Sequence, residues 1–110
     1  MAIDAEALRD LFAAFGPVSV RRMFGGAGVY ADGVMFALVS RGTVYLKADA
    51  ESQPLFAAEG CGPFFYDRAG KQATMTSYWR MPDRLYDDPD TLAQWARRSL
   101  AIAQAGRLRG

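Results

Sequence analysis

The sequence predicts an α+β domain, a two-layer sandwich with a mainly antiparallel sheet of five or six strands and helices packed mostly on one face. Apolar residues at helical spacing near both ends of the chain, and short strand-like runs joined by tight-turn sequences between them, lead to this prediction. A chain of 110 residues without repeats or linkers is expected to fold as one domain over residues 1–110.

The first helix is expected to begin at Asp4, a natural N-cap residue, and to stop at Gly16-Pro17. Ile3 and Leu8 occupy the positions of a hydrophobic staple. Apolar side chains recur at helical spacing on one side, at Leu8, Leu11, Phe12 and Phe15. This side of the helix should face the sheet.

Strands are expected from Val18 onward, where apolar and polar residues alternate. Asp32-Gly33 predicts a type I′ hairpin turn, and Arg41-Gly42 predicts a second turn. The run Val34–Val39 is apolar in both phases, which is typical of a central strand covered on both faces. A further strand over Thr43–Lys47 should follow.

Asp49 is expected to cap a second helix over Ala50–Glu59, in which Pro54 fits only near the first turn. A hairpin is then predicted around Ala69-Gly70, with strands over residues 64–67 and 74–80.

The final helix is predicted over Asp90–Gln104, after Asp88 as N-cap and Pro89 at the first helical position. The tail from Gly106 to Gly110 is expected to fray. Capping and a solvated first turn account for the nearby acidic cluster, which comprises Asp83, Asp87, Asp88 and Asp90.

Composition restricts the chemistry. Histidine is absent, which excludes Ser-His-Asp and Cys-His catalysis and any metal site that contains histidine. Cys61 is the only cysteine, so an intrachain disulfide is excluded, and we expect its thiol to be buried or idle. The net charge of +1 provides no strong field toward nucleic acid or membrane. No cofactor and no metal are expected.

The segment Gly26–Ala31 matches the pattern GxGxx(G/A) of dinucleotide-binding loops. Such a loop requires a helix directly after it, but a strand and the Asp32-Gly33 turn follow here. We therefore interpret Gly25, Gly26 and Gly28 as residues of a bulge or of a close approach between two backbones.

Tyrosine and arginine share the strand phase opposite the apolar one. The residues that could form a surface on a sheet face without helices are Arg21, Arg22, Tyr45, Tyr78 and Arg80, and Tyr66 could join them. Three interpretations remain open: cross-strand tyrosine packing, a protein interface, and stacking of single-stranded nucleic acid. Because the net charge is low, nucleic-acid stacking is the least favoured of these three interpretations.

The segment Arg22–Tyr30, RMFGGAGVY, resembles the signature of the N-terminal domain of the TfoX/Sxy family. Further matches follow in the right order at Gly33–Ala37, Val44–Asp49, Met75–Pro82 and Trp95–Arg98. The resemblance implies an α+β sandwich with an antiparallel sheet and a regulator of natural competence that acts with a cyclic-AMP receptor protein. It provides no catalytic residues. Longer members carry a C-terminal domain of helix-hairpin-helix character, which is not expected in this chain.

We therefore expect a non-enzymatic, cytoplasmic interaction module, an accessory regulator of transcription or DNA competence. A protein partner, such as a transcription regulator, and a homodimer are expected, and membrane association is not. The alternatives are direct nucleic-acid binding, and a small-molecule binder or enzyme of unknown type.

Overall fold

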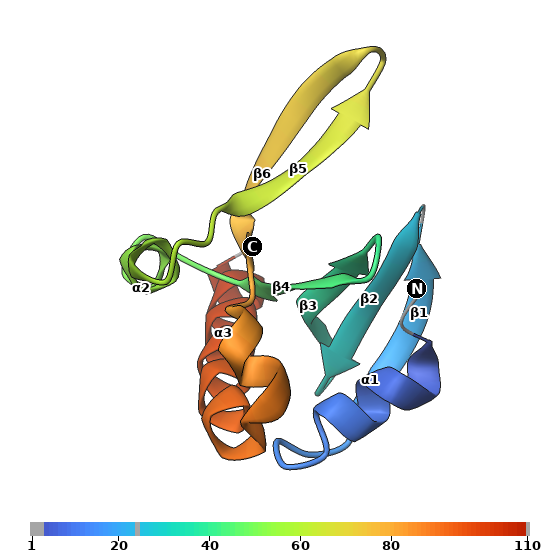
Figure 1. Cartoon of the computed structure of the whole chain (residues 1–110), viewed down its shortest axis with the longest axis vertical. Helices are drawn as coiled ribbons and strands as arrows, with labels where there is room; N and C mark the ends of the chain where they lie inside the picture. Colours follow the sequence, from blue (N-terminus) through green and yellow to red (C-terminus); the bar gives the residue numbers. More distant parts are fainter. Residues whose placement is uncertain (1–3, 24, 110) are drawn as a thin grey trace.

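The computed structural model describes residues 4–23 and 25–109. Six strands form one antiparallel sheet in the order β1-β2-β3-β4-β6-β5, and three α-helices accompany it (Figure 1). This architecture confirms the predicted α+β class. Ile3, expected to pack against Leu8, and Phe24 of the family signature lie outside the described residues.

The first half of the chain follows the prediction closely. Helix α1 spans Ala5–Leu11, and the Asp4 carboxylate accepts from the N–H of Ala7 as an N-cap does. The strands that follow are β1 (Ser19–Met23), β2 (Gly26–Ala31), β3 (Val34–Ser40) and β4 (Thr43–Lys47).

The turn between β2 and β3 has positive φ at both central residues, 51° at Asp32 and 78° at Gly33, which confirms the type I′ prediction. Gly26 lies where the backbones of β2 and β3 approach: a Cβ there would be 1.8 Å from the carbonyl oxygen of Val39. A close backbone approach is therefore confirmed as the role of this glycine.

Helix α2 is shorter than predicted and spans Gln53–Ala58, with Pro54 in its first turn. Asp49 does not cap it. Its carboxylate instead accepts from the N–H of Ser52 at 2.9 Å, and the Ser52 hydroxyl accepts from the N–H of Asp49 at 3.0 Å. These reciprocal bonds close a turn before the helix, because a short polar side chain competes with the helical bonding of nearby backbone.

The last third of the chain contains β5 (Pro63–Arg68), β6 (Lys71–Arg80), a 3-10 helix η1 (Asp83–Asp87) and α3 (Pro89–Arg109). The sequence pattern did not predict η1. The predicted end of α3 at Gln104, with a fraying tail from Gly106, was wrong, because the helix continues to Arg109.

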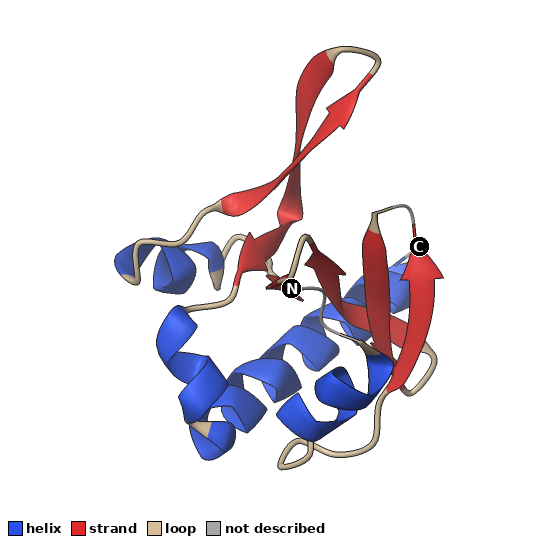
Figure 2. Ribbon diagram, turned by 45° about the vertical axis from the view of Figure 1, so that its right-hand side comes forward, coloured by secondary structure: helices blue, strands red, loops and turns tan. Residues whose placement is uncertain are grey.

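The core lies between the helices and one face of the sheet. Val44 and Leu46 of β4, Ala37 of β3 and Val29 of β2 point into it, and α3 packs against β3 and β4 (Figure 2). The pairing of β2 with β3 shifts between Val29 and Tyr30. This bulge lets the consecutive residues Phe36 and Ala37 both enter the core.

The hairpin of β5 and β6 projects from the body of the domain (Figures 1 and 2). Its base is held by Thr76, whose carbonyl oxygen accepts from the indole N–H of Trp79 at 2.8 Å and from the side-chain amide of Gln53 at 3.0 Å. We call residues 64–75 of this hairpin the arm.

Candidate interaction surface on the helix-free sheet face

The cross-strand pairs Tyr45–Arg80 and Lys47–Tyr78 lie in the phase opposite to the core residues Val44 and Leu46. They therefore lie on the face of the sheet that the helices do not cover. Because cross-strand partners share a face, the alternation extends this face to Arg21 in β1, Tyr30 in β2 and Met35 in β3. We call this surface the helix-free face.

Tyr78 lies in this face but is not an exposed contact residue, since only 5% of its surface is accessible. Its hydroxyl donates to the main-chain oxygen of Met35 at 3.1 Å. Burial, with a smaller contribution from Tyr30, raises the pKa of Tyr78 to about 12. The Lys47 ammonium lies 4.9 Å from the centre of its ring, at cation–π distance.

A second cation–π pair lies toward the other edge of the face. The Arg21 guanidinium is 4.9 Å from the centre of the Tyr30 ring. Gly28, the neighbour of Arg21 across the strands, leaves room for Tyr30, because a Cβ there would lie 3.0 Å from the tyrosine ring and 2.7 Å from the Met35 sulfur. Of the three tyrosines on this face, Tyr30 and Tyr78 are thus each covered by a cation.

Arg22 does not join this surface. Being next to Arg21 in a strand, it points to the opposite face, where it lines a cavity of about 690 Å³ with Asp4 and Arg41. The structure therefore places four of the five predicted residues on the helix-free face: Arg21, Tyr45, Tyr78 and Arg80.

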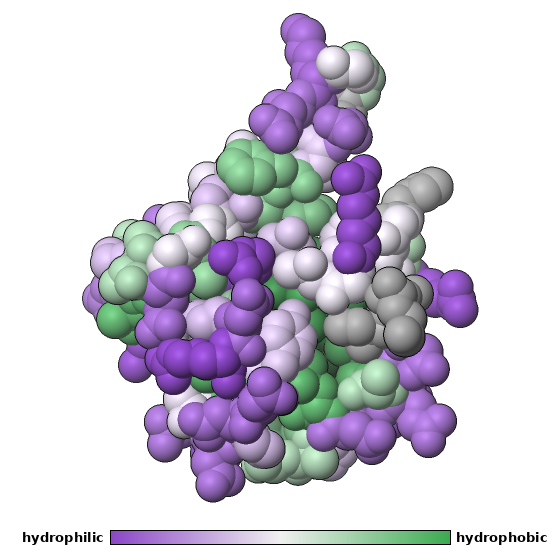
Figure 3. All heavy atoms as spheres, viewed as in Figure 1, coloured by the Kyte–Doolittle hydropathy of each residue, from purple (hydrophilic) through white to green (hydrophobic). Residues whose placement is uncertain are grey.

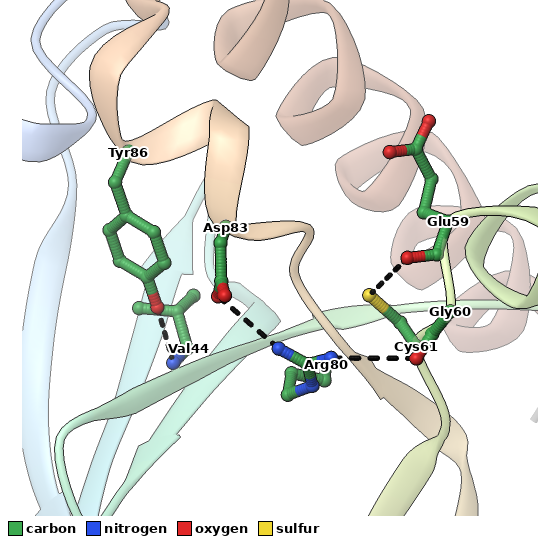
Figure 4. A network of polar contacts seen from close by, with 7 residues as sticks. All are labelled: Val44, Glu59, Gly60, Cys61, Arg80, Asp83 and Tyr86. Atoms are coloured by element: carbon green, nitrogen blue, oxygen red, sulfur yellow. Dashed lines mark hydrogen bonds and ion pairs between the residues drawn. The ribbon is translucent and has the colours of Figure 1, made fainter.

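Arg80 connects the sheet to the segments around it. Its guanidinium donates to the Asp83 carboxylate at 3.2 Å and to the Gly60 carbonyl at 3.5 Å (Figure 4). Its charge is therefore partly neutralised by Asp83. In the same network the Cys61 thiol lies 3.9 Å from the Glu59 carbonyl oxygen, and burial raises the pKa of Cys61.

Two further contacts hold η1 in place. Val44 of β4 donates its N–H to the Tyr86 hydroxyl at 3.0 Å (Figure 4). Arg84 donates to both oxygens of Glu59 at 2.9 and 2.8 Å, and these bonds lower the pKa of Glu59. The Asp88 carboxylate accepts from the N–H of Thr91 in the first turn of α3. This member of the acidic cluster therefore caps the helix, as predicted.

Aromatic side chains extend the helix-free face onto the arm. The rings of Tyr45 and Phe64 are 4.8 Å apart at their centres, and those of Phe64 and Tyr66 are 5.7 Å apart and stacked. Hydrophobic side chains gather at the base of the arm (Figure 3). Tyr66 joins the surface through this cluster.

The sequence did not predict three residues of this surface, Tyr30, Lys47 and Phe64. Lys47 has the same strand parity as Tyr45, so alternation alone could have identified it. Tyr30 and Phe64 each lie next to a register shift, which moves side chains between faces without a local signal.

Among residues 4–23 and 25–109, no group of three or more acidic, cysteine or histidine side chains is close enough to hold a metal ion. In the same part of the chain, no helix has the length and apolar character needed to cross a membrane.

The fold and this surface define a small α+β domain with helices on one face of an antiparallel sheet and a cationic, aromatic face on the other. The chain belongs to the TfoX N-terminal domain family, whose model matches residues 10–103. It is similar to protein Sxy of Escherichia coli (strain K12), with 26% identity over 95 residues that cover 86% of this chain. The match covers 45% of Sxy, so the chain spans less than half the length of that relative.

Proposed function

We propose that this chain is a non-enzymatic interaction module of a competence-related regulator, acting in the cytoplasm through contact with a protein partner such as a transcription regulator. Membership of the TfoX N-terminal domain family and the similarity to Sxy support the regulatory role. The observation that carries the interaction role is the helix-free face, where Arg21 and Lys47 each cover a tyrosine ring.

This arrangement favours an acidic protein surface over stacked bases. Stacking on single-stranded nucleic acid needs open aromatic faces, whereas the rings of Tyr30 and Tyr78 lie under cations and Tyr78 is buried. Arginine and tyrosine are also, with tryptophan, the residues enriched at energetically important positions of protein interfaces. The experiment must therefore distinguish a protein partner from nucleic acid.

The test reverses charges in the organism that carries the chain. We expect Arg21→Glu combined with Lys47→Glu to lower transformation frequency and the transcription of competence genes by roughly tenfold or more, because several contacts of about 1 kcal/mol each would be lost. Arg97→Glu reverses an exposed charge on α3 and serves as the matched control. Equal effects of the two changes, or no effect of either, would contradict the proposal.

A titration of the purified chain with single- and double-stranded DNA completes the test. Contact through protein predicts no binding that depends steeply on salt. DNA binding that weakens with rising salt and is lost in the Arg21→Glu, Lys47→Glu variant would assign the face to nucleic acid instead.

A further inference from the structure

The free edge of β5 carries unpaired main-chain groups. Arg68 and Lys71 flank the two-residue turn Ala69-Gly70 and so form a hydrogen-bonded pair of the hairpin. Because such pairs alternate along antiparallel strands, the main-chain groups of Phe64 and Tyr66 bond to β6, and those of Phe65 and Asp67 point away from it. β5 is also the last strand of the sheet.

This edge borders a groove of about 470 Å³. The consecutive residues Phe64, Phe65, Tyr66 and Asp67 line one side, and Ser40, Arg41 and Thr43 at the β3–β4 turn line the other. Neighbouring residues of a strand point to opposite faces. A groove that touches four in a row therefore reaches the edge of β5, and Gln72 of β6, the cross-strand partner of Asp67, also lines it.

The walls of the groove suit an extended peptide. Tyr45, Phe64 and Tyr66 provide an aromatic wall, and Phe65 is 50% exposed. Strand addition uses these two components: main-chain hydrogen bonds provide affinity, and alternate side chains of the peptide enter pockets on either face.

The geometry points to one occupant: we propose that an extended segment of a partner protein adds to β5 as a seventh strand of the sheet, within this groove. The inference rests on the proposed function as an interaction module and adds a second binding surface, at the edge of the sheet, to the helix-free face. The aromatic wall calls for apolar or aromatic side chains at alternate positions of the segment.

Two other occupants fit less well. The first is the arm of a second copy, which would bring two strands, β5 and β6. A groove of about 470 Å³ is of the size that holds a small ligand or a few extended residues, so two strands are too large for it. The lining carries both a cation, Arg41, and a carboxylate, Asp67, which does not favour a polyanion such as nucleic acid.

The test starts from a displayed library of short random peptides selected on the intact chain. Phe65→Pro removes the one N–H that points to the groove at this position and leaves the pairing with β6 intact, since proline is tolerated at an edge strand. Phe65→Ala is the matched control, because it removes the ring and keeps the N–H. Circular dichroism verifies that both variants fold.

We expect the selected peptides to bind Phe65→Pro roughly two- to tenfold more weakly than Phe65→Ala, as the loss of one main-chain hydrogen bond would produce. A scan of backbone N-methylation along the peptide should weaken binding at every second position, because alternate N–H groups of an added strand face β5.

Four outcomes would overturn the proposal. They are the absence of any enriched peptide, equal affinity for the two Phe65 variants, weakening by N-methylation that does not recur at every second position of the peptide, and binding of oligothymidylate in the groove in place of peptide. If the chain forms dimers in the absence of peptide, and Phe65→Pro abolishes these dimers, the edge binds a second copy of the chain instead. The test is independent of the charge-reversal experiment, because Arg21 and Lys47 do not line the groove.

Discussion

The Tyr78 hydroxyl on β6 donates a hydrogen bond to the main-chain oxygen of Met35 on β3, although β4 lies between these two strands in the sheet. The side chain thus crosses the helix-free face and ties three strands together. Its burial explains why a tyrosine with the strand parity of a surface residue is a structural element instead.

Tyr78→Phe should destabilise the fold by about 1 kcal/mol at neutral pH, because it leaves the Met35 carbonyl without its donor. Urea unfolding of the two proteins measures this difference. A change below the error of the measurement would show that the hydrogen bond contributes nothing to stability.

The same residue predicts a dependence on alkaline pH. Its folded pKa of about 12 lies above the value of about 10 expected in the unfolded chain. The stabilisation is therefore fully present below pH 10 and is lost as the pH rises toward 12, because the unfolded state releases the proton first. Between these values wild-type stability should fall more steeply than that of Tyr78→Phe, so their difference should shrink. Parallel curves would contradict the assignment.

Gly26→Ala should destabilise the domain by at least about 1–3 kcal/mol, since the new Cβ would meet backbone that cannot move aside. Gly62→Ala is the matched control, because no atom lies within 4 Å of its ideal Cβ. Thermal unfolding followed by circular dichroism measures both changes. Similar melting temperatures for the two variants would exclude a tight contact at Gly26.

Ala69 has φ of +52° in the turn of the arm, a conformation that asparagine and glycine adopt more readily. Ala69→Asn should therefore stabilise the hairpin, by up to about 1 kcal/mol. Gly70→Ala should act in the opposite direction, because alanine is strained at the φ of +79° that Gly70 has, even though no atom would lie within 4 Å of the new Cβ. Hydrogen exchange of the arm amides measures the effects locally. Slower exchange in Gly70→Ala than in Ala69→Asn would contradict this turn geometry.

Cys61 should react slowly with a disulfide reagent at neutral pH. Burial raises the pKa of its thiol, and only the thiolate reacts. We expect the reaction to be roughly tenfold or more slower in the native protein than in urea, where the thiol is exposed. Equal rates would show that the segment after α2 opens readily.

Local signals in the sequence determined much of the fold. The Asp4 cap, the type I′ turn at Asp32-Gly33 and the hairpin around Ala69-Gly70 were all predicted, because each depends on residues within three or four positions of one another. Where two local bonding patterns compete, as between Asp49 and Ser52, the predicted boundary was wrong.

Which residues form the helix-free face depended on the tertiary structure. Alternation fixes only the parity of a residue, so the sequence could not assign Arg21 and Arg22 to their opposite faces or show that Tyr78 is buried. These placements depend on sheet register, which shifts near Tyr30 and Phe64. Register arises from packing between segments far apart in the chain. By itself, the sequence determined the family, the strand and helix pattern and the surface residue types, while tertiary packing decided which of those residues meet.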